Sequence, residues 1–111
     1  MRQYEVWMAD LNPRMGTEPG KVRPVVVVQT DLLNRHHPST LVCPVTSNVQ
    51  PMSTLLRVHL AVGDGGVSEA CDVMMDQLRA IDNRRLVKKL GKLPLAAAEK
   101  VKINLKIVLD L

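Results

Sequence analysis

Short apolar segments that recur between turn signals constrain the fold of this chain more than any other feature. Six segments have the four to eight residues typical of strands, and glycine, proline or short polar stretches separate them. They are Tyr4–Leu11, Val25–Gln29, Leu41–Val45, Leu55–Leu60, Ala70–Asp76 and Leu78–Ile81. Short strands at this density favour a small β-barrel or a curled sheet.

Two of these segments indicate how deeply each strand is buried. Val25–Val28 is an uninterrupted β-branched run, which predicts a strand covered on both faces. In Leu56–Leu60 the apolar residues alternate with Arg57 and His59, the period-2 pattern of a strand with one buried face and one charged face in water.

One helix is predicted after Pro94, where Ala96–Ala98 begin a segment with apolar residues at helical spacing. Two apolar stripes run along it: Val101, Leu105 and Val108 form the first, and Ile103, Ile107 and Leu111 form the second. Two stripes are wider than one packing face requires. A contact between subunits is therefore one possible role of the second stripe.

The length of the chain, 111 residues, predicts one domain, residues 1–111, with a single hydrophobic core. Its longest apolar stretches are far shorter than the ~20 residues that span a bilayer. The first residues hold no apolar secretory segment. We therefore expect no membrane anchor and a cytoplasmic location.

Common catalytic and metal-binding patterns are absent from the sequence. There is no P-loop, GxGxxG, HExxH, GxSxG or EF-hand spacing, which excludes the common nucleotide-binding, metalloprotease and serine-hydrolase functions. Cys43 and Cys71 lie in apolar strand-like segments without CxxC spacing or paired histidines. They are expected to be buried, reduced thiols rather than metal ligands.

The net charge is +4, and the basic excess lies toward the C-terminus. Residues 84–106 carry eight basic side chains and one acidic side chain. This run fits a surface for phosphates or an acidic partner, and it fits a solvated helix face plus a turn equally well. Tyr4 and Trp7 are the only aromatic residues, so any recognition of nucleic acid rests on hydrogen bonds, charge and shape rather than on base stacking.

Arg23 stands where a polar, glycine-containing turn meets the Val25–Val28 strand. Pro19 and its neighbouring glycines mark the turn, and Pro24 favours an extended backbone at Arg23. The guanidinium is therefore expected to leave the chain in one preferred direction. This segment alone leaves two interpretations open, a strand end in solvent or a cation held for chemistry.

Polar side chains follow two further apolar segments. Thr46, Ser47 and Asn48 come directly after a predicted buried strand, where hydroxyl groups can face a cleft. Asp76 and Gln77 interrupt two apolar segments, as at a bulge or the edge of a site. A polar strand end that satisfies its own turn stays open as the alternative for Thr46–Asn48.

Four separated segments together resemble the MazF/PemK family of toxin endoribonucleases. They are Glu5–Pro13 (EVWMADLNP), Gly16–Gln29 with its KVRPVVVVQ run, Pro44–Asn48 (PVTSN) and Asp76–Asp82 (DQLRAID). Each segment is weakly specific alone. All four occur in the family's order and spacing, and they span nearly the whole chain.

The resemblance implies a mainly β fold, an SH3-like small β-barrel of the CcdB/PemK type with a C-terminal helix. It implies a homodimer whose interface forms a groove for RNA, and cleavage of single-stranded RNA at short sequences without metal or cofactor. It also implies a cognate MazE-like antitoxin that blocks the groove, as part of a type II toxin–antitoxin system.

The resemblance also assigns roles to residues by position. Arg23 and Thr46 match the family's catalytic arginine and threonine, and Glu18 matches a position of catalytic support. The expected RNA contacts are Lys21, Ser47, Asn48, Asp76 and Gln77. Some PemK-type members place an arginine where this chain has Met74, so a mechanism that needs that arginine is not expected here.

A guanidinium with a pKa above ~12 is a poor base. Glu18 is therefore the hypothesised proton acceptor.

Two functions from other classes remain as alternatives: a non-catalytic CcdB-like toxin that binds and poisons DNA gyrase, and an SH3-like adaptor or RNA-binding module without turnover. Arg23 and Thr46 discriminate between the first of these and a ribonuclease, because a gyrase-binding protein has no need for the arginine–hydroxyl pair.

Overall fold

The computed structural model describes residues 1–13, 15–18 and 20–111. Its strands are β1 (Glu5–Asp10), β2 (Val22–Val27), β3 (Ser39–Thr46), β4 (Arg57–Leu60), β5 (Cys71–Met74), β6 (Arg79–Asp82) and β7 (Leu86–Lys92). Its α-helices are α1 (Asp31–Asn34) and α2 (Leu95–Val108), and its 3₁₀ helices are η1 (Asp64–Gly66), η2 (Met75–Gln77) and η3 (Asn83–Arg85). All six strands predicted from the sequence are present, with ends shifted by a few residues.

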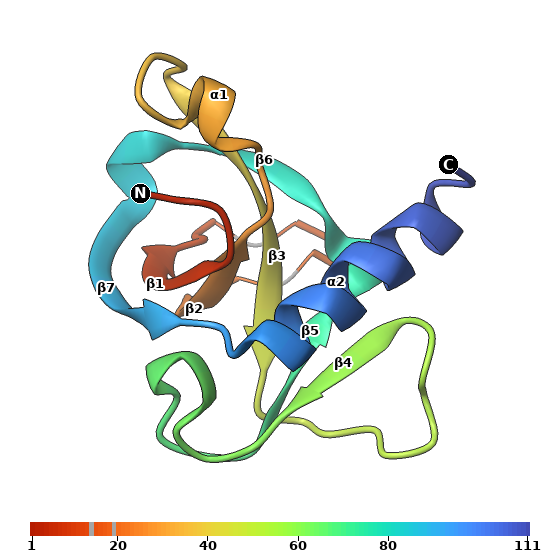
Figure 1. The fold of residues 1–111 in the computed structure, drawn as a ribbon. Helices are drawn as coiled ribbons and strands as arrows, with labels where there is room; N and C mark the ends of the chain where they lie inside the picture. The colour runs from red at the N-terminus through yellow and green to blue at the C-terminus, as the bar shows by residue number, and fades with distance from the viewer. Residues whose placement is uncertain (14, 19) are drawn as a thin grey trace.

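The strands form one antiparallel sheet in the order β4-β5-β3-β2-β1-β7, and β6 pairs with the other end of β3. Figure 1 shows the sheet curling so that β7 and β4 lie on different sides of the molecule, with α2 in front of β3 and β5. The predicted mainly β fold with a C-terminal helix is confirmed. Pairing among the described strands does not join β7 to β4, so the closed SH3-like barrel is not confirmed.

Strand β2 lies in the interior of the sheet, between β1 and β3. Val25, Val26 and Val27 are fully buried. Val26 packs into the core cluster beneath α2, whereas Val25 and Val27 pack into a second cluster on the opposite face. Successive strand residues point to opposite faces, so the β-branched run predicted to be covered on both sides is confirmed.

Helix α2 packs on the sheet through the first of its two predicted stripes. Val101 is fully buried, and Leu105 and Val108 pack against the core cluster. Ile103 and Ile107, from the second stripe, are each 55% exposed. The second stripe is therefore an apolar surface on this chain. Within the described residues, no helix is long and apolar enough to cross a membrane.

Strand β7 is the main element that sequence patterns did not predict. For the basic run that begins at Arg84 the sequence indicates either a helix face plus a turn or a phosphate surface; in the structure its first part forms η3 followed by β7. Among the described strands β7 pairs with β1 alone, and its three lysines are typical of such an edge strand. Lys89 Nζ lies 2.7 Å from Glu5 Oε2, which ties the two strands together.

Both cysteines are buried and free, as predicted. Burial, with a smaller contribution from Asp76, raises the pKa of Cys43 to about 12. Burial also raises the pKa of Cys71 to about 11, helped by neighbouring carboxylates of which Asp72 contributes most. Both groups therefore stay protonated thiols at neutral pH, a poor state for a nucleophile or metal ligand.

Candidate active site

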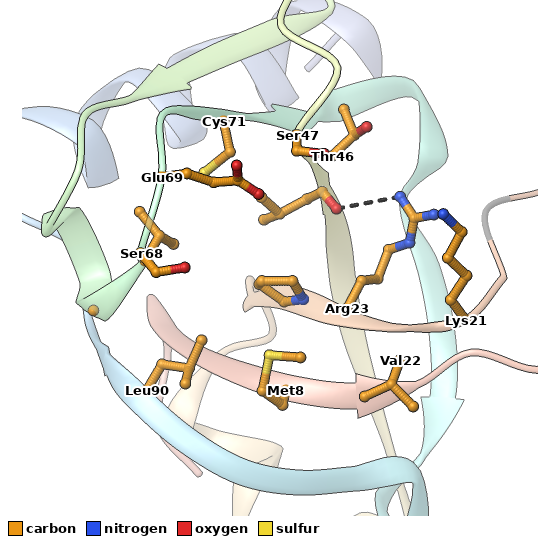
Figure 2. Close-up of a pocket in the computed structure, with 14 residues that line it drawn as sticks. Met8, Lys21, Val22, Arg23, Thr46, Ser47, Ser68, Glu69, Cys71 and Leu90 are labelled. Carbon is orange, nitrogen blue, oxygen red and sulfur yellow. Dashed lines mark hydrogen bonds between the residues drawn. The ribbon is translucent and has the colours of Figure 1, made fainter.

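A cavity of about 400 Å³ opens where β2, the end of β3 and the segment before β5 meet. Its polar wall is made by Lys21, Arg23, Thr46, Ser47, Ser68 and Glu69, and apolar side chains such as Met8, Val22, Val67 and Leu90 make the rest. Figure 2 shows Arg23, Lys21 and Thr46 gathered at one end of this cavity, with Glu69 and Cys71 at the other. The cavity therefore carries cations, hydroxyls and one carboxylate.

Arg23 lies near the predicted junction of turn and strand: it is the second residue of β2, opposite Ala9 of β1, because β2 begins at Val22 rather than at Val25. Its Nε donates to Gly20 O at 2.9 Å, and its NH1 donates to Val45 O at 3.3 Å. The second bond is the dashed line in Figure 2. Two backbone carbonyls thus hold the half-buried guanidinium against the end of β3, which confirms its preferred direction.

Thr46 is the last residue of β3 and lies opposite Asp72 of β5. Its Oγ1 accepts a hydrogen bond from the backbone N–H of Asn48 at 3.2 Å. Thr46 is half-buried and lines the cavity. Ser47 is exposed and lines the cavity beside it.

Lys21 lies next to Arg23 at the cationic end of the cavity (Figure 2). Its backbone has a positive φ of 67°, which is uncommon for a residue with a side chain. Two hydrogen bonds hold it there: Lys21 N donates to Asn12 Oδ1, and Leu11 N donates to Lys21 O, both at 2.8 Å. Two neighbouring cations make this end of the cavity attractive to a phosphate.

Four of the predicted site residues do not line this cavity. Glu18 is exposed on the segment before β2, and Asn48 is exposed next to Ser47 and donates its backbone N–H to Thr46. Asp76 and Gln77 lie in η2, after β5. Pro19, which marks the predicted turn, lies outside the described residues. The roles assigned to these side chains remain predictions.

Ser68 and Glu69 are cavity residues that sequence reasoning missed. They lie between η1 and β5, and their segment returns to the cavity opposite Arg23 (Figure 2). Both are exposed polar residues after a glycine pair, which is also the composition of an ordinary surface turn. Only the folded structure, in which this segment lines the cavity, distinguishes Ser68 and Glu69 from residues of an ordinary surface turn.

Among the described residues, no three histidine, cysteine, aspartate or glutamate side chains gather as a metal site would require. The polar side chains that line the cavity are an arginine, a lysine, three hydroxyls and one carboxylate. The arginine, the lysine and the hydroxyls can bind and polarise an anion through hydrogen bonds and charge.

Comparisons with known proteins show the family of this chain. Residues 2–109 match the family described as PemK-like, MazF-like toxin of type II toxin–antitoxin system. The chain is 33% identical over 111 residues to Endoribonuclease EndoA of Bacillus subtilis, covering 100% of this chain and 96% of that protein.

Solved structures of MazF proteins have the same fold as this chain. The crystal structure of MazF from Deinococcus radiodurans superposes with a TM-score of 0.84 at 26% identity, covering 100% of this chain and 97% of that one. A MazE–MazF structure from the same organism superposes with a TM-score of 0.80 at 26% identity, covering 100% of this chain and 96% of that one.

Proposed function

Because the chain belongs to the PemK-like, MazF-like family of toxins of type II toxin–antitoxin systems, we propose that it is an endoribonuclease that cleaves single-stranded RNA without metal or cofactor. The observation that carries the proposal is the cavity that holds Arg23, Lys21 and Thr46 together. A relative that matches the whole chain is named an endoribonuclease, which supports the same activity. The alternative of a gyrase-binding toxin has no support from these comparisons.

The chemistry follows from the groups available. The 2′-hydroxyl of the RNA attacks the adjacent phosphorus, a new O2′–P bond forms and the P–O5′ bond breaks. The products are a 2′,3′-cyclic phosphate and a 5′-hydroxyl end. One proton leaves O2′ and one reaches O5′, while negative charge grows on the non-bridging phosphate oxygens.

Arg23 and Thr46 stabilise that growing charge. A guanidinium presents a planar fork of N–H donors that matches phosphate oxygens, and the two carbonyls that hold Arg23 orient it before substrate arrives. The Thr46 hydroxyl accepts from Asn48 N, so its own O–H is directed to another acceptor, such as a phosphate oxygen or O2′. Lys21, Ser47, Asn48, Asp76 and Gln77 remain the proposed RNA contacts.

The proton acceptor is proposed to be Glu18, with Glu69 as the competing carboxylate because it lines the cavity itself. We expect Glu18→Gln to slow the chemical step about 100- to 10,000-fold and to remove the fall in rate at low pH, since a neutral amide has no proton to titrate. Single-turnover rates measured across pH test this. Glu69→Gln is the matched variant: if it removes the fall and Glu18→Gln does not, the role belongs to Glu69.

The proposal extends to partners and location. A homodimer would give the cavity a second wall, and the exposed Ile103 and Ile107 are apolar surface available for such contacts. The solved MazE–MazF complex supports a MazE-like antitoxin as the partner of this chain. We further infer one toxin domain, an SH3-like barrel that α2 and η1 complete, acting in the cytoplasm.

Growth arrest on induced expression separates the proposed function from the gyrase-binding alternative. We expect the unmodified chain to stop growth and the double variant Arg23→Ala/Thr46→Ala to be harmless at equal abundance. The physical reason is that both replacements remove donors to the phosphate and leave most of the protein surface unchanged. Growth arrest by the double variant would show that the chain acts through binding another protein.

A further inference from the structure

A buried carboxylate lies beside the candidate active site and has no part in the chemistry above. Asp72 is the second residue of β5, and its side chain is fully buried. Its neighbours along the strand, Cys71 and Val73, are buried hydrophobic residues. A charge is costly at such a position unless the protein satisfies it with hydrogen bonds and opposite charge.

Three groups satisfy this carboxylate. Asp72 Oδ2 accepts from Gln50 N at 2.8 Å and from Arg57 NH1 at 3.2 Å, and Asp72 Oδ1 lies 2.6 Å from His59 Nδ1. Burial pushes the pKa of Asp72 up, but the bonds from Gln50 and His59 and the charge of Arg57 outweigh it, so the pKa is lowered. Asp72 is therefore ionised at neutral pH.

The same groups tie down the segment that follows Thr46. Arg57 NH1 donates to Asn48 O at 3.1 Å as well as to Asp72, so one guanidinium nitrogen joins the carboxylate to this segment. The bond from Gln50 N joins the carboxylate to the same segment two residues later. Arg57, predicted to face water, is only 12% exposed in its side chain because it is turned onto Asp72.

Asp72 and Thr46 are also neighbours within the sheet. The strand register places Thr46 opposite Asp72 and Asp72 opposite His59, which forms one row across β3, β5 and β4. Residues directly opposite in antiparallel strands point to the same face. Asn48, whose carbonyl is held by Arg57, donates the hydrogen bond that Thr46 Oγ1 accepts.

We propose that Asp72, acting through Arg57 and Gln50, is a positioning residue that fixes the Asn48 amide and thereby the direction of the Thr46 hydroxyl. The proposal rests on the proposed function, because Thr46 must contact the reacting phosphate for its direction to matter. With the segment after Thr46 fixed, the Asn48 N–H occupies one lone pair of Thr46 Oγ1 and the O–H bond turns to the cavity. Without the hydrogen bond from Asn48 N–H, the Thr46 hydroxyl samples several rotamers.

A double-mutant cycle between Asp72→Asn and Thr46→Ala tests this coupling. Asp72→Asn keeps the shape of the side chain but removes its charge. We expect it to lower the single-turnover rate on a fluorescent single-stranded RNA about 10- to 100-fold, the cost typical of a misplaced catalytic group. RNA affinity should change little, because the cationic end of the cavity is intact. In the Thr46→Ala background the same change should cost less than about threefold, because the hydroxyl that it positions is gone.

Asp31→Asn is the matched control. Asp31 also accepts from a backbone N–H (Gln3, 2.7 Å) and a side-chain amide (Asn34, 2.8 Å) and pairs with an arginine, but it lies outside the cavity. It should leave the rate unchanged in both backgrounds. If Asp72→Asn slows cleavage by the same factor with and without Thr46, or no more than Asp31→Asn does, the positioning role is wrong.

A second variant guards against loss of folding in Asp72→Asn. Arg57→Lys keeps a cation that can pair with the carboxylate, but the lysine side chain ends one atom short of the position of Arg57 NH1, the nitrogen that contacts both Asp72 and Asn48 O, so the contact to Asn48 O is lost. It should show the same dependence on Thr46, with a smaller loss of about 10-fold. A loss that is independent of Thr46 overturns the proposal. Absence of cleavage by the unmodified chain would instead overturn the proposed function.

Discussion

Arg23→Ala is expected to reduce the rate of RNA cleavage by about 100- to 1000-fold, the usual cost of removing one preorganised donor to a developing oxyanion. The guanidinium is held by Gly20 O and Val45 O at the edge of the cavity, so alanine removes a donor that is already oriented before the substrate binds. Single-turnover cleavage of a fluorescent RNA at saturating protein measures the chemical step directly.

Two comparison variants make this result specific. Arg35→Ala removes an exposed arginine outside the cavity and should leave the rate within about twofold, since surface charges far from a site act weakly. Arg23→Lys keeps the charge but loses the planar fork, and it should recover only a small part of the lost rate. An Arg23→Ala protein that cleaves as fast as Arg35→Ala would remove Arg23 from the mechanism.

The second large effect concerns stability, at Gly66. Its φ is +84°, and a Cβ built there would lie 2.3 Å from the backbone oxygen of Leu90 in β7. Backbone in the left-handed region costs a residue with a side chain about 1–2 kcal/mol, and overpacking costs typically about 1–3 kcal/mol. We therefore expect Gly66→Ala to lower the free energy of unfolding by about 2–5 kcal/mol in urea titrations.

Gly63→Ala separates the two contributions. Gly63 also has a positive φ, +92°, but nothing lies within 4 Å of a Cβ built there. Only the backbone cost applies, so the loss should be about 1–2 kcal/mol. Equal losses in the two variants would mean that η1 does not pack closely on β7. This contact matters for the site, since Gly66 and Leu90 both line the cavity.

Sequence patterns predicted the parts of the fold that depend on local periodicity. The β-branched run of β2 and the first apolar stripe of α2 report burial directly, because strands alternate every second residue and helices repeat every 3.6 residues. Arg23 and Thr46 were predicted as site residues because each stands beside a strand with a clear pattern and because the family motifs include both. The two residues line one cavity, and their catalytic roles stay predictions.

The remainder depends on contacts between distant segments. Strand β7 is an edge strand rich in lysine. Its sequence therefore lacks the alternation of apolar and polar residues that marks a half-buried strand. Glu69 reaches the cavity only because η1 folds onto β7 and returns the chain toward β2. In the sequence Asp72 is one polar residue within an apolar segment. Its bonding partners Arg57, His59 and Gln50 come from other segments and meet it only in the folded chain. No local pattern encodes any of these three arrangements.

The central claim is that this chain cleaves RNA with its own side chains, and one measurement tests it most directly. A long single-stranded RNA is incubated with the purified protein in excess EDTA, and the new ends are mapped. The account predicts cuts at discrete short sequences that leave 2′,3′-cyclic phosphate and 5′-hydroxyl ends, made at least about 100-fold more slowly by Arg23→Ala and by Thr46→Ala. Intact RNA with folded protein, or cuts that both variants make as fast as the unmodified chain, would contradict it.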